Sequence, residues 1–157
     1  MSLPQGQQWL ARHRKEYITA GDAWLRAKRN SYGVPSDSGR KTALARLLSS
    51  VFTEKLEGLL WIRDWSAFPS SANLDLFYGY RKYLGDERLL IDAPCHIFSS
   101  GDTDSVQSLL CMSLYFYWDT VLVASDWDVV VTTSNDEFID LYGDQGEQGQ
   151  ELARKFE

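Results

Sequence analysis

The residues of this chain that are best suited to chemistry are carboxylates that have no cations near them in sequence. No Lys or Arg occurs from Leu89 to Ala153, whereas the same stretch contains twelve carboxylates. They are Asp92, Asp102, Asp104, Asp119, Asp126, Asp128, Asp136, Glu137, Asp140, Asp144, Glu147 and Glu151. Carboxylates in such numbers can attract a cationic partner or supply oxygen ligands to a divalent metal ion.

The most specific candidate for a binding element is the run Asp126, Trp127, Asp128 at the tip of a predicted hairpin. A tryptophan at a loop tip can bury on the order of 200 Å2 against a partner, and the flanking carboxylates can pair with Arg or Lys. The alternative is that the Trp127 ring folds back onto the core while the two aspartates stay in solvent. On the first interpretation the binding surface also includes Asp119, Asp136, Glu137 and Asp140.

A metal site would require several of these carboxylates to converge. Asp102 and Asp104 are candidate ligands for Mg2+ or Ca2+, together with Asp119, Asp136 and Glu137. Their spacing does not show convergence, and the first two suit the start of a helix, where the helix dipole favours negative charge. The run also lacks the spacing and the closing glutamate of a calcium-binding loop. We therefore expect no metal and no cofactor, and an enzyme based on clustered carboxylates is the alternative to a binding protein.

The other nucleophiles do not form a known catalytic pattern. Cys95 and His96 are adjacent in a predicted strand, so their side chains should point to opposite faces. No serine lies in a Gly-x-Ser-x-Gly elbow, and no glycine-rich phosphate loop follows a strand. The second cysteine, Cys111, completes neither a zinc motif nor a disulfide framework, so both thiols should be reduced. Binding is therefore favoured over catalysis.

The distribution of charge indicates what kind of partner the chain binds. Residues 1–58 contain ten basic and five acidic side chains, and residues 59–157 contain six and seventeen, for a net charge of −6. A sequence pI near 4.9 argues against nucleic acid as the main ligand, because phosphate contacts need positive charge. We expect a basic protein partner, in the manner of an inhibitor or immunity protein that blocks a cationic enzyme.

The same asymmetry of charge would also allow the basic and the acidic parts of the chain to bind each other. The basic N-terminal helices could lie over the acidic part, within one chain or between two copies, and so relieve self-repulsion. A homo-oligomer, in which the chain is a structural subunit, is therefore a further alternative.

Hydrophobic periodicity predicts the elements that position these residues. Helices are expected over 5–30, as one helix or two shorter ones, and over 40–56, 74–84 and 103–118. Strands are expected over 59–62 and 95–98, with a hairpin formed by 120–124 and 129–133. Ser134 and Glu137 match the N-cap and N3 positions of a capping box, which predicts a short helix through Tyr142 that ends at Gly143.

This order of elements predicts an α+β domain, or an α/β two-layer domain, with a small mixed sheet and a C-terminal hairpin, covered by about five helices. Residues 1–143 should form a single domain, and residues 144–157 a flexible or frayed acidic tail or a last helical turn. The longest apolar run, Leu109–Trp118, is about ten residues, too short to span a membrane. The first residues do not have the pattern of a secretion signal, so we expect a cytoplasmic protein with no membrane partner.

Overall fold

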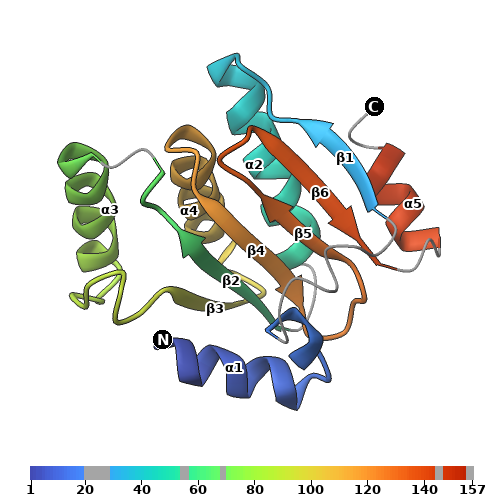
Figure 1. Ribbon diagram of the computed structural model, residues 1–157, viewed down its shortest axis with the longest axis horizontal. Coiled ribbons are helices and arrows are strands. Elements are labelled where there is room, and N and C mark those ends of the chain that lie inside the picture. Colours follow the sequence, from blue (N-terminus) through green and yellow to red (C-terminus); the bar gives the residue numbers. More distant parts are fainter. Residues whose placement is uncertain (20–28, 54–56, 68–69, 144–146, 155–157) are drawn as a thin grey trace.

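The chain folds around one six-stranded antiparallel sheet with helices on both of its faces, an α+β fold (Figure 1). The computed structural model describes residues 1–19, 29–53, 57–67, 70–143 and 147–154. Its strands are β1 (Arg29–Gly33), β2 (Glu57–Asp64), β3 (Cys95–Ser99), β4 (Asp119–Ala124), β5 (Val130–Thr133) and β6 (Phe138–Tyr142), and their order in the sheet is β1-β6-β5-β4-β2-β3. The helices are α1 (Leu3–Arg12), η1 (Glu16–Ile18, a 3-10 turn), α2 (Ser38–Thr53), α3 (Ser71–Tyr83), α4 (Thr103–Tyr115) and α5 (Glu147–Arg154).

The alternation of side chains along the strands divides the core into two layers. In β4, Leu122 and Ala124 face the layer that contains α2 and α4, whereas Val121 and Val123 face the layer that contains α1. Successive strand residues point to opposite faces, so the apolar run from Val121 to Ala124 needs cover on both sides. The α1 helix supplies Trp9 to the second layer.

The predicted hairpin is confirmed, because β4 pairs with β5 in antiparallel register from Thr120 opposite Thr133 to Val123 opposite Val130. The predicted helices over 40–56, 74–84 and 103–118 and the strands over 59–62 and 95–98 are also present, with boundaries shifted by a few residues. Residues 54–56 of the first of these helices lie outside the described residues. The sheet is nevertheless larger than expected, and each strand pair that the structure describes is antiparallel, so the expectation of a mixed sheet is wrong.

The short helix predicted after Ser134 is wrong, because residues 138–142 form strand β6. The residues of the apparent capping box make a tight turn between β5 and β6. The Ser134 N–H donates to the carbonyl of Phe138 at 2.9 Å, and the Glu137 N–H donates to the carbonyl of Ser134 at 3.1 Å. Glu137 has a φ of 64°, a left-handed conformation that turns use. Pairing with β1 on one side and β5 on the other satisfies the hydrogen-bonding groups of the β6 backbone. The single hydrogen bonds of a capping box stabilise a helix less than this pairing stabilises the strand.

The N-terminal prediction is wrong at its far end, where residues 29–33 form the edge strand β1 and pair with β6. The α1 helix ends at Arg12, and the following chain turns back through Arg14, whose φ is 58°. The stretch 20–28 of the predicted helix lies outside the described residues. At the other end of the chain, where the sequence predicted a frayed tail or a last turn, residues 147–154 form α5, and its Leu152 is buried in the core. None of the described helices has the length and apolar character needed to cross a membrane.

Candidate functional site

A cavity of about 320 Å3, which we call the acidic cavity, lies at the end of the sheet where β4 begins and β5 ends. Three carboxylates line it, those of Asp119, Asp136 and Asp140, together with one cation, Arg63. Residues with hydroxyl groups complete much of the polar lining, and they are Ser31, Thr120, Thr132, Thr133, Ser134 and Tyr142.

Strand register explains why these residues meet. Asp140 of β6 lies opposite Ser31 of β1 on one side and opposite Thr132 of β5 on the other. Residues directly opposite each other in neighbouring strands point to the same face of a sheet. Asp119 of β4 and Tyr142 of β6 also line the cavity, so four strands contribute to one surface.

Asp140 is held in place by two hydroxyl groups. Its side chain is buried, the Ser31 hydroxyl donates to Oδ1, and the Tyr142 hydroxyl donates to Oδ2 at 3.1 Å. Hydrogen bonds to an ionised carboxylate are stronger than neutral ones, so both contacts fix its orientation. Asp140 is therefore a preorganised acceptor within the acidic cavity.

Asp119 is a carboxylate whose charge is only partly compensated. Its Oδ1 accepts a hydrogen bond from the Asn135 N–H at 2.7 Å. Burial raises the pKa of Asp119, and the charges of Asp64 and Asp136 raise it further, whereas the Asn135 bond and Arg63 act in the opposite direction. A cation that entered the cavity would favour the ionised form.

The raised pKa of Asp119 leads to a stability prediction. Because the folded state binds its proton more tightly than the unfolded state, the contribution of Asp119 to stability falls as the pH rises above the ordinary value of 3.8. We expect Asp119→Asn to increase the free energy of unfolding at pH 7, and to increase it less at pH 4, because the amide oxygen can still accept the Asn135 bond. Urea denaturation at both pH values measures this. A variant less stable than the wild type at pH 7 would contradict the expectation, and Asp104→Asn, at an exposed position on α4, is the control.

The remaining predicted binding residues lie elsewhere. Asp126 and Asp128 are exposed in the loop that follows the far end of β4, and Glu137 is exposed in the β5–β6 turn. None of these three lines the acidic cavity. The structure therefore brings together Asp119, Asp136 and Asp140 of the predicted set, and separates them from the other members.

Trp127 is not an exposed anchor, so that expectation is wrong. Its side chain is 6 % exposed and its ring lies 5.0 Å from that of Phe52, centroid to centroid, in the core. The backbone of the loop is held as well, because the buried Lys15 donates from Nζ to the Trp127 carbonyl at 2.8 Å and lies 3.6 Å from the Asp128 carboxylate. The ring folds back onto the core while the two aspartates stay in solvent.

The carboxylates considered as metal ligands do not all converge, because Asp119 and Asp136 line the acidic cavity whereas Asp102 and Asp104 lie outside it. Asp102 accepts from the Ser99 N–H at 2.8 Å and so closes the turn before α4, and Asp104 is exposed in the first turn of that helix. Among the residues that the structure describes, no group of three or more His, Cys, Asp or Glu side chains is arranged to hold a metal ion.

Cys95 and His96 point to opposite faces of β3, as their adjacency predicted. Cys95 packs in the layer with α1, and burial raises the pKa of its thiol to about 12. His96 packs against Phe77 of α3, and burial, followed by the charge of Arg81, lowers its pKa to about 3. At neutral pH neither thiolate nor imidazolium is present at useful concentration.

Several residues of the acidic cavity were not found by sequence reasoning. Ser31 lies just past the predicted N-terminal helix, and Tyr142 lies in the segment that was predicted as a helix and forms β6. A signal for this surface is visible in the sequence as polar residues beside apolar ones, since Thr132 follows the buried Val131 and Asp140 lies between the buried Ile139 and Leu141. Comparisons of this chain with models of protein families, with curated proteins and with solved structures find no match.

Proposed function

We propose that this protein binds a basic protein partner and that the acidic cavity receives an Arg or Lys side chain of that partner. The observation that carries the proposal is the convergence of three carboxylates, Asp119, Asp136 and Asp140, in one cavity whose lining includes a single cation, Arg63. The three carboxylates and Arg63 together have a formal charge of −2, and partial exclusion of water strengthens the attraction of such a group for a cation.

The other lining groups suit a guanidinium in particular. The planar fork of arginine pairs with two carboxylate oxygens at once, and Asp140 is already oriented for such a contact by its two hydroxyl partners. Phe138 also lines the cavity and is half exposed, so its ring can contact the stem or the face of a guanidinium. An inhibitor or immunity protein that covers a cationic enzyme would use a site of this kind, because complementary charge speeds the encounter and selects the partner.

Titration of the 15N-labelled protein with a tetra-arginine peptide tests this function. The reporter is the amide of Asn135, because its N–H bonds to Asp119 and should shift when a cation engages that carboxylate. We expect Asp119→Asn to weaken peptide binding about tenfold or more, which corresponds to the loss of one partly buried charge contact. Asp104→Asn removes the same charge at an exposed position outside the cavity, so it should change affinity less than about twofold.

The control peptide separates specific binding from general attraction. Tetra-glutamine has no charged side chain and should leave the Asn135 amide unchanged. If tetra-arginine shifts amides across the whole acidic surface equally, or if Asp104→Asn weakens binding as much as Asp119→Asn, the cavity is not the binding site and the proposal fails.

A further inference from the structure

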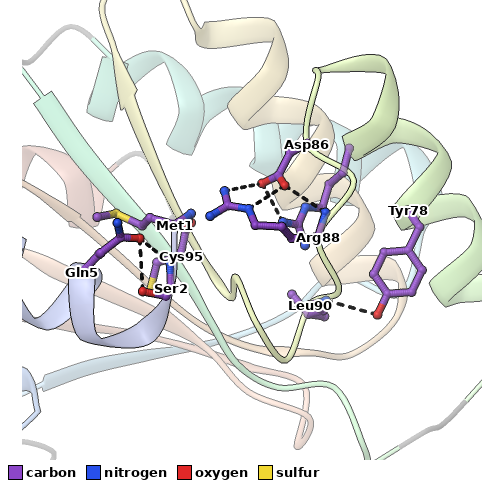
Figure 2. Close-up of polar contacts among 9 residues, drawn as sticks. Met1, Ser2, Gln5, Tyr78, Asp86, Arg88, Leu90 and Cys95 are labelled. Atoms are coloured by element: carbon purple, nitrogen blue, oxygen red, sulfur yellow. Dashed lines mark hydrogen bonds and ion pairs between the residues drawn. The ribbon is translucent and has the colours of Figure 1, made fainter.

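The two edges of the sheet differ in how their backbone groups are used. At the β3 edge, the Cys95 N–H donates to the Met1 carbonyl at 3.2 Å (Figure 2), and the Ser99 N–H donates to Asp102 at 2.8 Å. The other edge is β1, and none of the described residues forms a strand on its outer side (Figure 1). This strand also contains neither a proline nor a register shift, two features that protect the edges of sheets. A further extended chain can therefore pair with β1 more readily than with β3.

The pairing of β1 with β6 shows which backbone groups point outward. The Val34 N–H donates to the carbonyl of Glu137 at 2.7 Å, so the backbone groups of Val34 point toward β6. This direction alternates along an antiparallel strand, so the groups of Tyr32 also point toward β6, whereas those of Ser31 and Gly33 point away from it. Ser31 and Gly33 are both exposed, and a side chain at Gly33 would extend into open space. An added strand can reach the N–H and C=O groups of both residues.

The acidic cavity begins at the same edge. Ser31 lines it and donates its hydroxyl to Asp140, which lies opposite in β6. Residues opposite each other in neighbouring strands share a face, so a residue that pairs with Ser31 from outside would point to the face on which Asp140 lies. Two strand spacings, about 10 Å, would separate the added strand from β6, and the side chains of an arginine and an aspartate together span this distance. The small Ser31 side chain leaves room for the arginine to cross β1.

The neighbouring position of β1 suits an apolar side chain. Gly33 lies opposite Phe138, whose ring is 50 % exposed and lines the acidic cavity. A side chain that pairs with Gly33 from outside would cross a backbone that has no side chain and could contact this ring. The edge therefore favours a basic residue and an apolar residue two positions apart.

We propose that an extended segment of the basic partner adds to β1 as an antiparallel strand, with an arginine opposite Ser31 and an apolar residue opposite Gly33. This inference rests on the proposed function and names the conformation and the sequence pattern of the segment that reaches the acidic cavity. Antiparallel pairing continues the arrangement of each strand pair that the structure describes. A second copy of β1 is a less suitable occupant, because two-fold pairing of the edges would bring two acidic cavities side by side on one face.

Titration of the 15N-labelled protein with the peptide acetyl-Thr-Val-Thr-Arg-Thr-Val-Thr-amide tests the added strand. When the arginine lies opposite Ser31, a valine lies opposite Gly33. We expect the amide protons of Ser31 and Gly33 to shift downfield and to exchange with solvent about tenfold more slowly at saturation, because they then donate to peptide carbonyls. The amide of Tyr32 is the internal control, since it points toward β6 and should change little.

Modified peptides separate the backbone contacts from the charge. N-methylation of the arginine, whose N–H faces β1, should weaken binding about tenfold or more, whereas N-methylation of the threonine that follows it, whose N–H faces solvent, should change affinity less than about twofold. Replacement of the arginine by citrulline, an uncharged group of similar shape, should also weaken binding about tenfold.

Three results would overturn the proposal. The first is a peptide that shifts neither the Ser31 nor the Gly33 amide at about 5 mM, and the second is equal binding of the two N-methylated peptides. In both cases the proposed function stands as long as tetra-arginine shifts the Asn135 amide. The third is a protein that is dimeric in sedimentation equilibrium and becomes monomeric when the peptide binds, because a second copy then occupies the edge. If the citrulline peptide binds as tightly as the parent peptide, the charge of the cavity plays no part, and both the inference and the proposed function fail.

Discussion

Trp127→Ala is expected to destabilise the protein by about 3–5 kcal/mol, the cost of removing a large buried aromatic side chain and leaving a cavity. The ring is 6 % exposed and packs on Phe52, so its loss removes contacts on the α2 side of the sheet. The anchoring of the loop by Lys15 through the Trp127 carbonyl limits how far the chain can collapse into the space. Urea denaturation followed by circular dichroism measures the change in the free energy of unfolding.

Asp126→Asn in the same loop is the control, because a substitution of an exposed side chain normally changes stability by less than about 0.5 kcal/mol. If Trp127→Ala costs less than about 1 kcal/mol, the ring lies in solvent and the loop tip becomes a candidate binding element again.

Asp86→Asn is expected to cost about 3 kcal/mol, because it leaves the buried guanidinium of Arg81 without its counter-charge. Arg81 is 1 % exposed and its Nη2 lies 2.7 Å from Asp86, whereas Arg88, which shares this carboxylate, is half exposed. Arg88→Gln should therefore cost less than about 1 kcal/mol, as surface ion pairs do. Equal effects of the two substitutions would show that the buried position of Arg81 is unimportant.

The dependence of the free energy of unfolding on pH below about 4 provides a second test of Asp86. The hydrogen bond from Arg88, followed by that from Arg81, lowers the pKa of Asp86 far below its ordinary value of 3.8. A carboxyl whose pKa is lowered by folding contributes stability above its ordinary pKa and loses it as the pH falls further. The wild type should therefore lose stability more steeply below about pH 4 than Asp86→Asn does.

Short-range patterns in the sequence predicted the elements that depend on neighbouring residues. The helices α2, α3 and α4, the strands β2 and β3, and the β4–β5 hairpin all follow from periodicity and turn residues within a few positions. The start of α3 shows the limit of such reasoning, because the helix was predicted from residue 74, whereas Ser70 is its N-cap and the Ser70 Oγ accepts from the Asn73 N–H. The sequence predicted that a helix is present here, but it did not predict the residue at which the helix begins.

The strands β1 and β6 were missed because their stability comes from distant partners. Ser31 and Asp140 are 109 residues apart in sequence and meet only through the β1–β6 pairing. The residues of the apparent capping box, Ser134 and Glu137, are equally suited to a tight turn. Backbone pairing on both sides of β6 decided between the two, and that information is not local.

Some properties of the candidate site follow from composition, and others follow only from the tertiary structure. Composition alone establishes the excess of carboxylates after Leu89 and hence the negative charge of this part of the chain. The shared cavity of Asp119, Asp136 and Asp140 follows from the folded sheet instead, because strand register sets which side chains lie next to one another. The same is true of Trp127, since a short hairpin loop can project an aromatic ring outward or fold it inward. The free energy of packing on Phe52, which no local pattern encodes, favours the inward position.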